Sequence, residues 1–257
     1  MENAKNRVFG LLLLTCGSLF LVQAAPAAAQ DAPGFLFGTP HVTLSLNMGY
    51  GIPNTGSDLF QEVDTLLTLG MSDFNGPVVG GSFAVHLNNR LDLAFDVTYL
   101  GSSTWSEYRD FVEELDGGQT IPIEQETKFT RVPVTLSLRY RFMDHGREIS
   151  QFAWVPTKWS PYVGFGAGRV YSKFEQDGDF VDFYDYSIFG ENLISEDWAW
   201  TAHALGGVEY SLSARMVLTA EGRYSWAEAD LDRNFYQGYE PLDLSGFQGT
   251  FGIGVRF

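Results

Sequence analysis

The sequence predicts an all-β fold, an eight-stranded antiparallel up-and-down β-barrel that crosses a membrane, and two observations predict it. Residues 246–257 alternate apolar side chains with small or polar ones and end on an aromatic residue. Side chains alternate between the two faces of a strand, so one face of this segment is apolar and the other is small or polar. Seven earlier segments share the pattern, and the connections between them alternate between short and long. Short turns at one end and long loops at the other are typical of transmembrane barrels.

The eight predicted strands cover residues 41–51, 77–87, 90–100, 128–142, 161–173, 198–212, 215–226 and 246–257. Their long polar connections are 52–76, 101–127, 174–197 and 227–245, which we expect to be extracellular loops. The connection 143–160 is too long for a tight turn, and we expect a small cap there. Pro133 lacks the N–H that a closed barrel uses, which predicts a bulge. Aromatic residues gather at the predicted strand ends, as in the two girdles of a membrane barrel; they include Tyr50, Tyr99, Trp198, Trp200, Trp226 and Phe247 at the loop side, and Tyr140, Phe142, Tyr162, Tyr210 and Phe257 at the turn side.

Residues 1–29 have the pattern of a secretory signal peptide, followed by the barrel domain at 30–257. Lys5 and Arg7 precede an apolar run, and Ala27-Ala28-Ala29 supplies small residues for cleavage. An alternative is a lipoprotein, with Cys16 as the acylated residue. Cys16 is the single cysteine, so its removal with the leader would leave no disulfide and no thiolate metal site.

Charged residues fall on the inward parity of several predicted strands. A narrow eight-stranded barrel is filled by its own side chains, and buried charges persist only when paired. We therefore expect a lumen ion-pair network of Glu209, Glu221, Arg223, Arg139 and Arg256. A structural network that fills the lumen is one interpretation, and a gated proton or ion path through the same residues is the other.

The predicted loops are acidic. Without Glu2, Lys5 and Arg7 the chain keeps 14 basic and 31 acidic residues, so nucleic acid is not an expected partner. Asp177, Asp179 and Asp182 are a weak candidate for a hard cation such as Ca²⁺, against the alternative of a solvated acidic loop. Apolar residues of the first and third loops either pack together over the barrel mouth or form a hydrophobic entry, and the sequence does not choose.

The chain resembles the small OmpA/OmpX/OmpW-like outer-membrane β-barrels. The resemblance covers roughly residues 40–257 and rests on the terminal strand, on Pro161-Tyr-Val-Gly-Phe-Gly-Ala-Gly168, on Gly206-Gly-Val-Glu-Tyr210 and on Glu221-Gly-Arg-Tyr224. It implies the bacterial outer membrane as location after export. It also implies outer-membrane lipid, lipopolysaccharide, periplasmic chaperones and the barrel-insertion machinery as partners of a monomer. The C-terminal residues Phe247, Phe251, Ile253, Val255 and Phe257 resemble the insertion signal of such proteins.

Three functions remain open at this point. The first is a structural and surface-interaction protein with a filled polar lumen, and the second is a small passive channel for ions or small hydrophobic molecules. The third, a lipid-modifying enzyme, is the least favoured. The chain has four histidines, and no paired Asp/His arrangement stands out in the loops. We therefore predict no catalytic residues and no cofactor.

Overall fold

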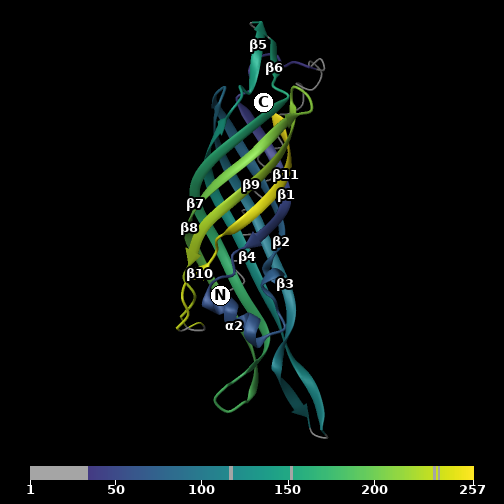
Figure 1. Cartoon of the computed structure of the whole chain (residues 1–257), viewed down its shortest axis with the longest axis vertical. Coiled ribbons are helices and arrows are strands. Elements are labelled where there is room, and N and C mark those ends of the chain that lie inside the picture. Colours follow the sequence, from purple (N-terminus) through teal and green to yellow (C-terminus); the bar gives the residue numbers. More distant parts are fainter. Residues whose placement is uncertain (1–33, 116–117, 151–152, 234–235, 237) are drawn as a thin grey trace, which may run out of the picture.

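The computed structural model describes residues 34–257 except 116–117, 151–152, 234–235 and 237, and it is a closed barrel with extensions at both ends (Figure 1). The predicted signal peptide and its cleavage site lie outside these residues. The elements are β1 (Val42–Pro53), α2 (Asp58–Leu66), η2 (Met71–Phe74), β2 (Gly76–Asn88), β3 (Leu91–Leu115), β4 (Gln119–Arg141), β5 (Gly146–Ser150), β6 (Ala153–Pro156), β7 (Trp159–Val181), β8 (Ile188–Ser211), β9 (Met216–Ala229), β10 (Leu242–Asp243) and β11 (Gly246–Arg256).

Eight strands close into one antiparallel ring. The order of hydrogen-bonded neighbours is β9-β11-β1-β2-β3-β4-β7-β8, and β8 pairs again with β9. The terminal strand β11 closes the ring against β1, with Thr43 opposite Arg256 and Pro53 opposite Gly246. The predicted eight-stranded antiparallel barrel is confirmed. Two pairs of strands, β3–β9 and β11–β4, lie diametrically opposite in this order, which matters for the lumen.

The outer wall of the barrel is apolar and exposed. Leu46, Met48 and Phe251 keep about 70% of their side-chain surface free, and they alternate with buried or small inward residues as the period of two predicts. Water would penalise such a belt, whereas lipid hydrocarbon would not. The barrel is therefore a transmembrane one. Among the described residues, no helix is long and apolar enough to cross a membrane.

The long connections are more ordered than predicted. The segments 101–127 and 174–197, expected to be loops, largely continue the flanking strands as two long hairpins, β3–β4 and β7–β8, beyond the ring (Figure 1). Their alternation of polar and apolar residues is weak, which is why the period of two did not reveal them. The first connection forms α2 and η2, whose buried residues Leu59, Phe60 and Phe74 turn toward the barrel.

Pro133 sits in the ring without the predicted bulge. The β3–β4 pairs Val97–Val134 and Leu100–Arg131 have the same register, and the pairing between them is simply skipped. On its other side, Pro133 pairs with Val170 in unbroken register. A missing N–H thus interrupts one ladder locally instead of shifting the strand.

The β5–β6 hairpin projects beyond the end of the barrel that carries the short turns, which we call the turn end (Figure 1). This hairpin accounts for the long 143–160 connection. Trp154 is 1% exposed and packs with Leu36 and Ala214, while its backbone exchanges hydrogen bonds with Leu36. Burial lowers the pKa of the neighbouring His145, and the charge of Arg141 lowers it further.

Candidate functional site

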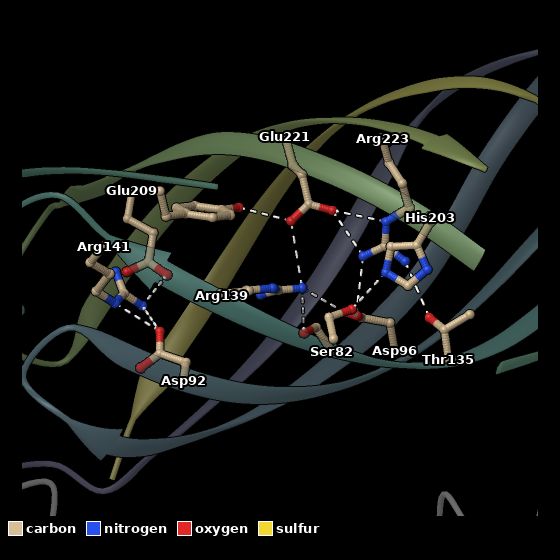
Figure 2. Close-up of polar contacts among 12 residues, drawn as sticks. Ser82, Asp92, Asp96, Thr135, Arg139, Arg141, His203, Glu209, Glu221 and Arg223 are labelled. Atoms are coloured by element: carbon tan, nitrogen blue, oxygen red, sulfur yellow. Dashed lines mark hydrogen bonds and ion pairs between the residues drawn. The ribbon is translucent and has the colours of Figure 1, made fainter. Parts of the chain in front are cut away.

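The lumen holds the densest set of charged side chains in the barrel. They stand on the inward parity of the strands, where the sequence placed them, and form two clusters at different depths. Figure 2 labels every member of the two clusters except Arg256. We call them the turn-side cluster (Asp92, Arg141, Glu209 and Arg256) and the central cluster (Asp96, Arg139, Glu221 and Arg223).

The turn-side cluster is organised by Arg141 of β4. Its Nε donates to Asp92 Oδ2 at 2.7 Å, and its Nη2 donates to Glu209 Oε1 at 2.8 Å. Arg256 of β11 approaches the second oxygen of Glu209 at 3.4 Å and donates to Ser211 Oγ at 3.0 Å. Asp92 is fully buried. One arginine therefore compensates two buried carboxylates. Removing it should be destabilising, because a buried charge that loses its partner is costly.

The central cluster joins opposite walls of the ring. Arg223 of β9 donates to Asp96 Oδ2 of β3 at 3.1 Å and to Glu221 Oε1 at 2.9 Å. Arg139 of β4 donates to Asp96 Oδ1 at 2.8 Å and lies 3.5 Å from Glu221 Oε2. Because β3 and β9 are diametrically opposite, the Arg223–Asp96 pair spans the lumen.

Neutral polar groups complete the central cluster. Ser137 Oγ donates to Asp96 Oδ2 at 2.9 Å and also contacts His203 Nε2, while Arg223 reaches Thr135 Oγ1 (Figure 2). Tyr162 Oη donates to Glu221 Oε2 at 2.9 Å. Predicted to lie in the turn-side girdle, Tyr162 is instead 2% exposed and points inward. The Gly-rich strand gave no clear parity, which explains that error.

The five predicted network residues do not form one network. Glu221, Arg223 and Arg139 meet in the central cluster, and Glu209 and Arg256 meet in the turn-side cluster. The predicted network left out Asp92 and Arg141 of the turn-side cluster and Asp96 of the central cluster. Their inward parity was readable from the sequence, but the depth at which each strand contributes depends on the register around the ring.

Buried aromatic side chains pack together toward the loop end, and we call them the aromatic plug (Phe60, Phe74, Phe129, Phe174 and Tyr236). The ring of Phe60 on α2 lies 4.6 Å from that of Phe74, 5.7 Å from Phe129 and 6.1 Å from Phe174. Phe60 and Phe129 have no exposed surface. Of the two arrangements left open by the sequence, the apolar residues of the first loop adopt the packed one.

A hydroxyl–imidazole–carboxylate chain lies beside the turn-side cluster. Thr43 Oγ1 is 2.9 Å from His86 Nε2, and His86 Nδ1 is 2.6 Å from Asp92 Oδ1. This order of groups serves acyl transfer in hydrolases. Here all three side chains are buried in the lumen, and Asp92 is also bound by Arg141. We infer that Thr43, His86 and Asp92 have a structural role.

Two further predicted sites can be placed. No group of three or more His, Cys, Asp or Glu side chains within the described ranges is arranged to hold a metal ion, and Asp182 Oδ1 instead accepts the Tyr184 N–H at 2.8 Å. The C-terminal residues Phe247, Phe251, Ile253, Val255 and Phe257 all face outward and are exposed. Their role as an insertion signal stays a prediction.

The sequence matches no protein-family model and no curated protein. Solved outer-membrane proteins match in structure. OprG of Pseudomonas aeruginosa has a TM-score of 0.46 at 13% identity, covering 86% of this chain and 98% of that one. Neisserial surface protein A gives 0.44 at 14% identity, covering 85% and 98%, and outer membrane protein W of E. coli gives 0.39 at 18%, covering 85% and 98%. The closed ring of hydrogen bonds, rather than these likenesses, establishes the fold.

Proposed function

We propose that the protein is an outer-membrane scaffold whose lumen is closed and whose long hairpins act at the cell surface. In this arrangement the turn end, where β1 begins and β11 ends, faces the periplasm, and the loop end faces outward. The proposal rests chiefly on one observation, the succession of the turn-side cluster, the central cluster and the aromatic plug along a single narrow lumen.

The charged clusters support closure because their pairs link strands across the barrel. Opening the lumen would separate Arg139 and Arg223 from both Asp96 and Glu221. These buried charges would then lack partners, which costs several kcal/mol in a low-dielectric interior. Thermal fluctuation at ordinary temperature does not populate such a state appreciably. A stable path for ions would require a different arrangement of these side chains.

The hairpins support a surface role because they are held together. Phe111 of the β3–β4 hairpin stacks on Tyr186 at 6.1 Å between ring centroids and meets Phe183 edge-on at 5.6 Å. Tyr186 has a positive φ of 60°, and the hydrogen bonds of Asp182 and Asp185 fix this tip. An ordered, acidic, aromatic tip presents a defined surface to other molecules. We propose no particular ligand for it.

The passive channel is the second candidate. Small polar side chains of β1, β9 and β11 line a cavity next to the central cluster, among them Thr43, Ser45, Asn47, Thr219 and Thr250. Arg139, Glu209 and Glu221 also line this cavity, so it borders both charged clusters. It is the region through which water or an ion would pass if the clusters moved.

Solute permeation distinguishes the two candidates. The refolded chain without residues 1–29 is placed in liposomes, and its closed-barrel state is verified by heat-modifiable gel mobility. Liposome swelling in small sugars and amino acids should equal that of empty vesicles, while an open porin swells its vesicles in parallel. Size-dependent swelling by the folded protein would favour the channel.

We further propose that the chain is a monomer inserted by the barrel-insertion machinery after escort by periplasmic chaperones. The alternating exposed face of β11 supports this proposal. Replacing Phe257 with Ser should slow assembly in cells without changing the stability of protein refolded in detergent. Normal assembly of that variant would remove the C-terminal residue from the signal.

A further inference from the structure

A compact group of cations and aromatic rings lies on the outer wall at the loop end. We call it the rim patch: Lys128 of β4, Arg169, Tyr171 and Lys173 of β7, and Trp198 and Trp200 of β8. The wall positions follow from the neighbours, because Phe129, Val170 and Phe174 are buried on the opposite parity. The patch begins where the apolar belt ends.

The distribution of basic residues makes this patch unusual. The other Lys and Arg side chains after residue 29 lie elsewhere. Five face the lumen (Arg131, Arg139, Arg141, Arg223 and Arg256), and four lie at the turn end (Arg90, Arg147, Lys158 and Arg215). Two lie in the long connections of the loop end (Arg109 and Arg233). Within the described chain, the three cations of the rim patch thus lie on two adjacent strands, β4 and β7. An acidic protein has concentrated positive charge at one depth of its lipid-facing wall.

The register brings the patch together. Across β4 and β7, Lys128 lies opposite Glu175 and Thr130 opposite Lys173, so the two lysines are diagonal neighbours about 7–8 Å apart. Across β7 and β8, Arg169 lies opposite Trp200 and Tyr171 opposite Trp198. The Arg169 guanidinium stands 4.9 Å from the centroid of the Trp200 ring, and Tyr171 and Trp198 pack at 5.5 Å.

Both lysines retain capacity for an anion. Lys128 Nζ is 2.7 Å from Glu126, and Lys173 Nζ contacts Glu175. The lysine side chains are 39% and 31% exposed, so these ion pairs are weak and exchange readily. An ammonium has three donors, and each lysine here uses one of them on a carboxylate that itself belongs to the rim.

We propose that the rim patch binds the phosphate of a glycolipid headgroup in the outer leaflet. Trp and Tyr mark the depth of the headgroups in membrane barrels, and the three cations stand at that depth or just beyond it. Glu175 and Glu196 lie opposite Lys128 and Lys173 across the strands, and Glu126 lies farther out on the same face. In this proposal the three carboxylates repel free anions and accept hydrogen bonds from sugar hydroxyls. This inference rests on the proposed outer-membrane location and assigns one binding site within it.

The test uses the refolded chain from residue 30 and purified bisphosphorylated lipid A in detergent with EDTA, observed by native mass spectrometry. The triple variant Lys128→Gln, Arg169→Gln, Lys173→Gln should bind lipid A at least about tenfold more weakly, since each cation near an anionic lipid surface contributes roughly fivefold. The matched control, Arg90→Gln, Arg147→Gln, Lys158→Gln, removes three cations at the turn end and should bind as the native chain does. Heat-modifiable mobility verifies folding, and the single lysine variants replace the triple one if it does not fold.

Two additional probes identify the ligand. Dephosphorylated lipid A should bind the native chain as weakly as lipid A binds the triple variant, and millimolar inorganic phosphate should not compete. Equal binding by native and triple variants, or equal binding of dephosphorylated lipid A, would overturn the proposal. Competition by inorganic phosphate would assign the patch to free phosphate and overturn its lipid source. A permeable barrel that still binds lipid A would contradict the closed-lumen function and leave this site intact.

Discussion

In the closed lumen that we propose, different physical interactions hold the two halves. Toward the turn end, Arg141 and Arg223 hold buried carboxylates through charged hydrogen bonds. Toward the loop end, Phe60 and Phe174 exclude water by apolar packing. The charged half is built entirely from side chains of the ring strands. The aromatic half depends on α2, which a connection outside the ring supplies.

This difference suggests that one half of the lumen determines the stability of the barrel and the other determines access to the lumen from the loop end. Removing one of the charges leaves its buried partners with less compensation inside the ring, so it destabilises the barrel itself. Phe60 and Phe74 can move away with their connection, while Phe129 and Phe174 stay on ring strands that keep their backbone hydrogen bonds. Damage to the plug should therefore be local, whereas damage to the charged half should be global.

The largest global effect is expected for Arg141→Ala. The substitution leaves Glu209 with only Arg256, at 3.4 Å, and Asp92 with no arginine partner. The free energy of unfolding should therefore fall by about 3–5 kcal/mol. Urea unfolding in lipid vesicles measures it. Arg90→Ala, which breaks the exposed pair with Asp144, is the control and should leave the unfolding curve in place. A native-like curve for Arg141→Ala would contradict the role of the cluster.

Phe60→Ala should have a comparable effect confined to the plug. Loss of a buried aromatic side chain costs about 3–5 kcal/mol. Here the loss should weaken the docking of α2 and leave the stability of the eight-stranded barrel unchanged. Hydrogen exchange of the amides of residues 58–74 should accelerate, and amides of β1 and β11 should not change. A matching fall in protection of the ring strands would mean that the plug and barrel unfold together.

Arg223→Ala should be milder than Arg141→Ala. Arg139 remains 2.8 Å from Asp96 and 3.5 Å from Glu221, so both carboxylates keep a cation and the expected loss is about 2–3 kcal/mol. The same urea titration compares the two variants directly. Unchanged stability of Arg223→Ala would show that the pair spanning the lumen contributes nothing.

The smallest effect is expected from pH at the turn end. The pKa of His145 is lowered in the folded state by burial and by Arg141, so the unfolded chain binds more protons below its ordinary pKa of about 6.5. Stability should then be complete above that pH and fall by about 1.4 kcal/mol per unit below it. His145→Asn removes this titration. Equal loss of stability between pH 7 and 5.5 in both chains would assign the pH dependence to other groups.

The sequence predicted the ring better than its contents. Period-two alternation identified all eight strands because lipid on one side and a polar lumen on the other impose opposite demands on neighbours such as Leu93 and Asp92. The partners inside the lumen were only partly predicted, since Arg141 finds Glu209 through the tilt and register of strands distant in the chain. The hairpin extensions were not predicted as strands. Outside the membrane both faces of a strand meet similar surroundings, so the sequence need not alternate apolar and polar residues.

The most direct test of the closed lumen is single-channel recording of the refolded chain from residue 30 in planar bilayers, with heat-modifiable mobility as proof of folding. Two closures in series predict no discrete conductance steps from the native protein. They also predict none from Phe60→Ala, because the charged half stays shut when the plug is loosened. Reproducible steps from the folded native protein would contradict the account and make Glu209, Glu221 and Arg223 candidates for a gate.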